Sequence, residues 1–295
     1  MDQMKPQDSL QRFVFEHAPV RGEIVHLEAT WRAVLERHEY PPALRQTLGE
    51  LMAAAALLAA TLKFSGTLIM QMQGSGPVKL LVVECAADMT MRATAKWSGE
   101  PSPGPLSRML GSGRFAITID PQEAGKQAYQ GIVSLEGDTV AQVLENYMAR
   151  SEQLDTRLWL AADAAHSGGM LLQKLPGGTT EDPDAWDRAI HLGGTISREE
   201  LLGLPAAEIV HRLYHEEDIR LFEASPVSFR CSCSSERVAN MLRLLGYEEV
   251  RSILEERGAI EVNCEFCNRH YRFDPVDAEQ LFAAAVPLPP GKTLH

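Results

Sequence analysis

The sequence lacks the features that mark a membrane-embedded or exported protein. Its longest apolar run, from Leu51 to Leu62, is well short of the about 18 residues that a membrane-spanning helix needs. The first residues, MDQMKPQDSLQRF, do not show the basic stretch followed by an apolar one that a secretory leader would have. Cysteine is also scarce, with 5 in 295 residues. We therefore expect a cytoplasmic protein with no membrane partner, in a compartment where permanent disulfides are rare.

An excess of basic residues is missing as well. The chain has 28 lysines and arginines against 40 acidic residues, a formal net charge of −12. Binding to nucleic-acid phosphates needs a local excess of positive charge, so we expect no nucleic-acid partner. Residues 176–225 alone have 11 acidic and 4 basic residues, which is more than half of the net charge. Carboxylates in that segment repel one another and oppose its compact folding.

The periodicity of the first 178 residues predicts an α+β core domain of mixed helices and strands. Apolar and β-branched residues alternate in short segments that read as strands, while residues 42–63 have the length and Ala-rich face of a buried helix. Turn-forming GSGP separates two of the expected strands. The predicted domain extends over residues 1–178.

The pattern changes after residue 178. Residues 179–225 contain three short amphipathic segments, which open on Asp, Ser or Pro and predict short helices. Few of their residues could form a separate core, so we expect a helical linker that depends on its neighbours for stability. Residues 226–285 predict a small domain of two helices and a strand, and residues 286–295 predict a disordered tail.

Four of the cysteines form two close pairs in the small domain. Cys231 and Cys233 occur in the run RCSCS, and Cys264 and Cys267 in NCEFCNRHYRF, with 30 residues between the pairs. Closely spaced thiols can take two corners of a tetrahedron around Zn²⁺, and two such pairs complete the set of ligands. A domain of this size with so little apolar content is marginal without a link of this kind. The spacing therefore predicts one zinc ion bound by these four thiolates.

The residues alone leave the role of that zinc open. Four-cysteine zinc sites are usually structural, and an inert site would have the same ligands. Thiolates are also the form that oxidants attack, so loss of the metal could unfold the domain and make the site a redox switch. A catalytic zinc would need an open position and a ligand such as His270, which we expect on the strand leaving the site. Cys85 lies alone in an apolar strand and is expected to pack in the core.

At these cysteines the chain resembles the bacterial redox-regulated chaperone family, the 33 kDa heat-shock chaperonin. The matching residues are FRCSCSSERV and GAIEVNCEFCNRHYRFD, with YQGIV and GGMLLQKLPGG upstream. The likeness covers nearly the whole chain, and a CxC followed about 30 residues later by a CxxC is specific to this family among zinc proteins.

The resemblance implies an ATP-independent holdase that is an inactive, zinc-bound monomer when reduced, and not an enzyme. It implies that oxidation pairs Cys231 with Cys233 and Cys264 with Cys267, that zinc leaves, and that the linker unfolds. The oxidised form is then expected to form a homodimer and to bind unfolding client proteins. Two alternatives are a constitutive zinc-ribbon binding module, which would need Arg230, Arg237, Arg269 and Arg272 in one basic patch, and a zinc hydrolase.

Overall fold

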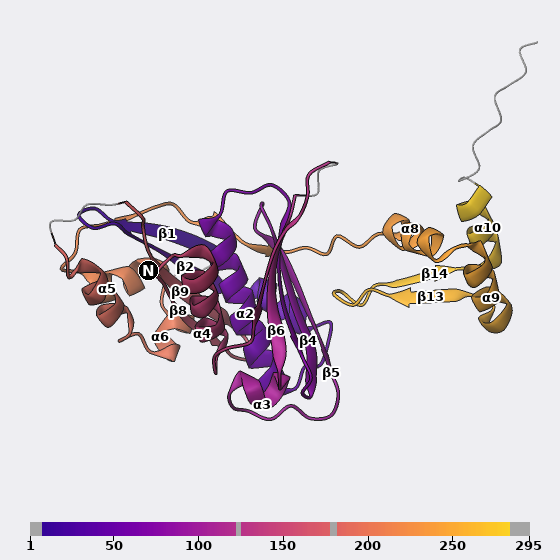
Figure 1. The fold of residues 1–295 in the computed structure, drawn as a ribbon, viewed down its shortest axis with the longest axis horizontal. Helices are drawn as coiled ribbons and strands as arrows, with labels where there is room; N and C mark the ends of the chain where they lie inside the picture. Colours follow the sequence, from indigo (N-terminus) through magenta and orange to yellow (C-terminus); the bar gives the residue numbers. More distant parts are fainter. Residues whose placement is uncertain (1–7, 122–124, 178–181, 284–295) are drawn as a thin grey trace, which may run out of the picture. The chain divides into compact units, whose positions relative to one another are not determined.

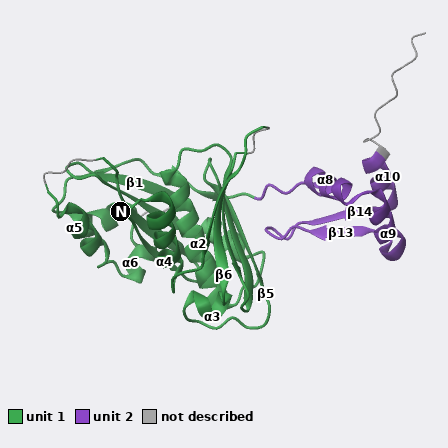
Figure 2. Ribbon diagram, in the orientation of Figure 1, with its two compact units in different colours: residues 1–230 green, residues 231–295 purple. Residues whose placement is uncertain are grey.

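The chain forms two compact units, residues Met1–Arg230 and Cys231–His295 (Figure 2). The computed structural model describes residues 8–121, 125–177 and 182–283. The expected tail, residues 286–295, lies outside these ranges. Each unit has its own hydrophobic core, in agreement with the expected α+β class.

The first unit contains two six-stranded sheets (Figure 1). The first sheet has the strand order β10-β1-β2-β9-β8, with β11 also paired to β1. Its strands are β1 (Ser9–Phe15), β2 (Val20–Leu27), β8 (Thr156–Ala162), β9 (Ser167–Lys174), β10 (Ile219–Leu221) and β11 (Ser225–Pro226). The runs RLWLAADA and GGMLLQKLPGG predict a pair of strands, and β8 and β9 are indeed antiparallel neighbours.

The second sheet has the order β12-β5-β4-β3-β6-β7. Its strands are β3 (Thr67–Gly74), β4 (Val78–Ala86), β5 (Thr90–Trp97), β6 (Gly113–Asp120), β7 (Tyr129–Ser134) and β12 (Ser228–Phe229). Strands β3 to β6 form antiparallel pairs, whereas β12 joins the edge of β5 in parallel.

Helix α2 (Pro42–Thr61) contacts both sheets, as Figure 1 shows. Alanines at positions 53–56 are fully buried, and their small side chains allow strands to pack closely on the helix. Strand β2 serves two cores: Val25 and Leu27 pack toward α2, while Ile24 packs on the opposite face. No helix in the described part of the chain has the length and apolarity needed to cross a membrane.

Four further helical elements complete the framework of the first unit. They are α1 (Ala29–Leu35), α3 (Leu106–Leu110), α4 (Val140–Tyr147) and the π-turn η1 (Met148–Glu152). The hydroxyl of Thr139 caps α4 by accepting a hydrogen bond from the amide of Gln142 at 3.2 Å.

The acidic segment forms three short helices on the outer face of the first sheet. They are α5 (Ala185–Gly193), α6 (Arg198–Gly203) and α7 (Ala206–Tyr214). Their N-cap residues are Asp184, Ser197 and Pro205. The sequence predicted the last two, whereas it placed the start of the first helix at Asp182, two residues too early. Ser197 forms a capping box with Glu200. Leu213 and Tyr214 pack with Ile24 in a cluster separate from the α2 core. The segment is therefore folded onto the first unit in this structure.

The second unit is small. It contains α8 (Ser235–Leu245), α9 (Tyr247–Arg257), β13 (Ile260–Asn263), β14 (His270–Phe273) and α10 (Pro275–Ala283). Its core has six buried residues: Ala239, Leu242, Val250, Ile260, Phe273 and Ala278. The unit begins at Cys231 rather than at the expected 226, because β11 and β12 pair with strands of the first unit.

Glu23 on β2 is a buried carboxyl group whose ionisation should affect the stability of the first unit. The residue is 2% exposed, and its Oε2 has no hydrogen-bond partner among the described residues. Burial raises the pKa of Glu23 from 4.5 to about 8, although Arg21 and Arg12 oppose the shift. The unfolded chain releases this proton at lower pH than the folded chain, so stability should fall as pH rises from about 5 to 8.

Glu23→Gln should flatten this pH dependence and stabilise the first unit at pH 8 by on the order of 3 kcal/mol. Urea unfolding at pH 5, 6, 7 and 8, monitored by the circular dichroism of the helices, measures the free energy of unfolding at each pH. The exposed Glu39→Gln is the matched control and should leave the slope unchanged. An equal slope in the Glu23 variant and the wild-type protein would contradict the assignment.

Candidate metal centre

The CxC segment lies immediately before helix α8. Ser234 caps the helix by accepting a hydrogen bond from the amide of Arg237 at 3.2 Å. The Arg237 side chain reaches back and donates to Ser232 Oγ at 2.7 Å, between the two cysteines. The helix start therefore fixes Cys231 and Cys233, and its dipole favours negative charge on their sulfurs.

The CxxC segment forms the turn that joins β13 to β14. The amide of Asn268 donates to the carbonyl of Cys264 at 2.8 Å, and the amide of Cys264 donates to the carbonyl of Arg269 at 2.9 Å. Asn268 adopts a left-handed conformation with φ of 57°, which asparagine tolerates better than most residues. The turn thereby points Cys264 and Cys267 to the same side of the hairpin.

The two segments bring all four sulfurs together. Their Sγ atoms lie within 4.8 Å of one another. Two close separations join one pair to the other: 3.6 Å between Cys231 and Cys264, and 3.4 Å between Cys233 and Cys267. A tetrahedron with zinc–sulfur bonds of about 2.3 Å has sulfurs about 3.8 Å apart, so the cluster fits Zn²⁺.

The four thiols influence one another's ionisation. Partial burial acts to raise the pKa of Cys233, but hydrogen bonds from Tyr271 and the other cysteines outweigh it and lower the pKa to about 7. Burial raises the pKa of Cys267 to about 12, and that of Cys264 is also raised, chiefly by burial. Ionisation of one thiol therefore makes ionisation of the neighbouring thiols less favourable. A divalent cation would remove this competition and hold all four as thiolates.

Of the other groups near the cluster, Tyr271 contacts one of its sulfurs, whereas His270 has a separate partner. Tyr271 on β14 donates its hydroxyl to Cys233 Sγ at 3.0 Å, a contact that the sequence alone did not single out. Alternation along β14 places Tyr271 on the same face as the buried Phe273, which is the signal that could have found it. His270 instead lies 2.8 Å from Asn263 Oδ1 across the hairpin and is not in the group of four. Cys85 is fully buried, as expected, and burial raises its pKa to about 12.

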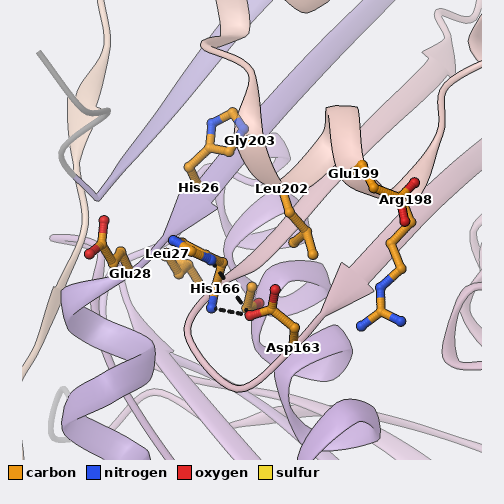
Figure 3. Close-up of a pocket in the computed structure, with 10 residues that line it drawn as sticks. His26, Leu27, Glu28, Asp163, His166, Arg198, Glu199, Leu202 and Gly203 are labelled. Carbon is orange, nitrogen blue, oxygen red and sulfur yellow. Dashed lines mark hydrogen bonds and ion pairs between the residues drawn. The ribbon is translucent and has the colours of Figure 1, made fainter. Parts of the chain in front are cut away.

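A cavity of about 580 Å³ in the first unit is lined by residues of β2, the β8–β9 turn and α6 (Figure 3). Several of its polar groups have partners within the protein. Asp163 accepts the amides of Ala165 and His166, each at 2.7 Å, and closes the β8–β9 turn. Burial lowers the pKa of His26, and the neutral ring donates to the carbonyl of Leu201 in α6 at 3.1 Å. The cavity lining therefore holds α6 and the turn in place.

Comparison with known proteins agrees with this arrangement. A family model described as Hsp33 protein matches residues 8–274. The chain belongs to the Hsp33 protein family. It is 54% identical over 294 residues to a 33 kDa chaperonin of Methylobacillus flagellatus, with 99% of this chain and 100% of that one covered. It is also 54% identical over 280 residues to the 33 kDa chaperonin of Chromobacterium violaceum, with 95% of each covered.

The fold of the Hsp33 family extends to a distant solved structure. The crystal structure of a 33 kDa chaperonin from Thermotoga maritima matches with a TM-score of 0.81 at 21% identity. It covers 95% of this chain and 99% of that chain. At this identity the likeness shows the fold alone, and the two-sheet unit with its small companion is the shared architecture.

Substituting one cysteine tests the metal centre. Cys267→Ser should weaken zinc binding by more than about 100-fold, because a hydroxyl does not replace a thiolate ligand, whereas Tyr271→Phe should weaken it by about 10-fold through loss of an outer contact. Competition with a chelator of known zinc affinity measures both. Cys85→Ala, away from the cluster, should bind zinc like the wild-type protein. Equal zinc affinity in the Cys267 variant and the wild type would exclude Cys267 as a ligand.

Proposed function

We propose that this chain is a redox-regulated, ATP-independent chaperone that is inactive when reduced and zinc-bound. Oxidation activates it to hold unfolding and oxidatively damaged proteins and to prevent their aggregation. The observation that carries the proposal is the four-sulfur cluster, which joins two segments of a unit with only six buried core residues. Relatives named 33 kDa chaperonin at 54% identity support the chaperone part.

The proposed switch converts four thiolates into two disulfides, Cys231–Cys233 and Cys264–Cys267. Each disulfide removes two electrons from two sulfurs, and one hydrogen peroxide accepts them as its O–O bond breaks and, with two protons, gives two water molecules. Disulfide sulfurs have lost the negative charge that holds Zn²⁺, so the metal is released. The four thiols are half-buried, which leaves them open to a small oxidant.

Loss of the metal would destabilise the second unit. Structural zinc contributes on the order of 10 kcal/mol of apparent folding free energy in modules of this kind. The metal links positions on either side of a 30-residue segment, while each local disulfide closes a ring of three or four residues. Unfolding of this unit would then spread to residues 179–225, the proposed linker, whose apolar faces would become available to clients.

The proposed partners are unfolding proteins and, after oxidation, a second copy of this chain. The proposed location is the cytoplasm, where thiols rest in the reduced state. We propose neither a nucleic-acid nor a membrane partner. Four sulfur ligands would fill a tetrahedral zinc, which supports a role without catalysis.

The arginine contacts favour this proposal over a constitutive zinc-ribbon module. Arg230 is paired with Asp88 at 2.7 Å, and Arg272 lies 3.8 Å from Glu261. Arg237 is hydrogen-bonded to Ser232. Two of the four arginines that a nucleic-acid patch would need are therefore matched by carboxylates.

Peroxide treatment should release one zinc per chain and convert the protein into a suppressor of aggregation. Zinc release is read with a chromogenic chelator, and suppression by light scattering of a heat-unfolding test protein without ATP. Hydrogen exchange on the same samples should show residues 182–225 losing protection. Peroxide should activate Cys85→Ala as it activates the wild type. In Cys264→Ser, peroxide should no longer change the suppression of aggregation.

Three results would count against the proposal. Zinc release without suppression would remove the chaperone function, and full suppression by the reduced zinc form would remove the switch. Unchanged protection of residues 182–225 in the active protein would remove the link between zinc and linker. Peptide mapping of the oxidised chain tests the two disulfide pairings separately.

A further inference from the structure

The segment from Ile219 to Arg230, here called the edge strap, covers the edges of both sheets in the first unit. Strand β10 pairs antiparallel with β1, so that Phe13 faces Leu221, and β11 pairs with the start of β1. Strand β12 then pairs in parallel with β5 in the other sheet. Figure 1 shows this segment running beside β1. A single stretch of chain therefore closes the outer edge of β1 and one end of the edge of β5.

The attachment to β1 is made mainly by backbone groups. The amide of Glu16 donates to the carbonyl of Asp218 at 2.9 Å, and the amide of Phe222 donates to the carbonyl of Arg12 at 2.9 Å. The amide of Val227 also donates to the carbonyl of Asp8 at 3.0 Å. Backbone pairing of this kind accepts many different side chains. Another extended peptide could therefore make the same bonds if the strap left.

The side chains of the strap show which sequences this edge accepts. Ile219 and Leu221 are half-buried against the outer core, which contains Phe13 and Phe15. Arg220 lies between them, exposed, and pairs with Glu16 at 3.1 Å. The edge of β1 thus fits an extended segment that alternates apolar and polar residues, as many segments of an unfolded protein do.

The C-terminal end of the strap is attached to β5. The amides of Ser228 and Arg230 donate to the carbonyls of Met89 and Met91 at 3.2 and 3.0 Å. Val227 is buried in the main core, and the guanidinium of Arg37 lies 4.2 Å from the centre of the Phe229 ring. These contacts hold the strap at the residue directly before Cys231.

Oxidation would act on the strap through the chain itself. A bridge between Cys231 and Cys233 must bring their Cα atoms to within about 4.4–6.8 Å, which bends a segment that follows extended backbone. Strand β12 has only two residues and β10 only three, so each has few bonds to lose. A change at Cys231 therefore begins two residues from β12, one of the two-residue strands of the strap.

We propose that the edge strap occupies the site at which a client protein binds. Its release opens the edge of β1 to an extended segment of an unfolding protein in which apolar and polar residues alternate. The inference rests on the proposed function and specifies its binding surface. An open edge leaves unpaired amides and carbonyls beside Phe13, Val14 and Phe15, a combination that readily adds another strand. The client bonds to backbone groups, which explains how one surface could bind proteins of unrelated sequence.

A synthetic peptide tests the recognition chemistry in the full-length protein. The probe is a ten-residue peptide alternating valine and lysine, and its matched control is N-methylated at every residue, which blocks pairing along both edges and leaves the side chains unchanged. The peroxide-oxidised protein should bind the unmodified peptide at least about tenfold more tightly than the reduced protein, because the reduced strap occupies the edge most of the time. The N-methylated peptide should not gain affinity on oxidation.

A strap variant separates release from oxidation. Leu221→Asp should loosen β10, so the reduced zinc form should bind the peptide within about threefold of the oxidised wild type. Arg220→Lys keeps the charge on the exposed side of the same strand and should behave as the reduced wild type. Hydrogen exchange of the oxidised protein with peptide bound should show residues 9–16 protected and residues 219–230 unprotected.

Each other outcome overturns the inference in a distinguishable way. Equal binding of the N-methylated peptide would assign clients to an apolar face rather than to a strand edge. Protection of residues 219–230 in the oxidised protein would show that the strap stays or is exchanged with a second copy. If the oxidised protein suppresses aggregation in either case, the proposed function stands and only the edge assignment fails. If it does not suppress aggregation, the proposed function fails first.

Discussion

The contact among four sulfurs is the constraint on which the second unit depends. Six buried residues form its core, which is little apolar surface to offset the entropy of ordering the chain. The sulfurs join the start of α8 to the β13–β14 turn, with separations of 3.6 and 3.4 Å between the two pairs. A metal bound at this point would therefore also stabilise the fold of the unit, and chemistry that changes the sulfurs would change that fold.

The main core of the first unit contains none of the four clustered cysteines. This core includes α2 and strands from both sheets, and it does not involve the metal. Between this framework and Cys231 lie only short elements: three acidic helices and three strands of two or three residues. Segments of this kind open at low free-energy cost while the rest of a protein stays folded. Under the proposed function, the segment that opens would therefore lie between the core of the first unit and the unit that zinc would stabilise.

The sequence predicted that the four thiols lie together, because paired thiols at short spacing are typical of metal sites. It also predicted α2 and the β8–β9 pair, whose periodicity extends over many residues. It could not predict β10, β11 and β12, because strands of two or three residues have no periodicity and are stabilised only by the edges they meet. The contact of Tyr271 with Cys233 was likewise invisible, since it depends on the hairpin bringing the two together.

The most direct test of this account is hydrogen exchange of the reduced protein after zinc is removed with a chelator, with reductant present throughout so that no disulfide forms. The account predicts that residues 231–283 lose protection when the metal leaves, while amides of α2 keep theirs. Restoring zinc should restore the protection. Full protection of residues 231–283 without metal would contradict the claim that the sulfur–metal link holds this unit together.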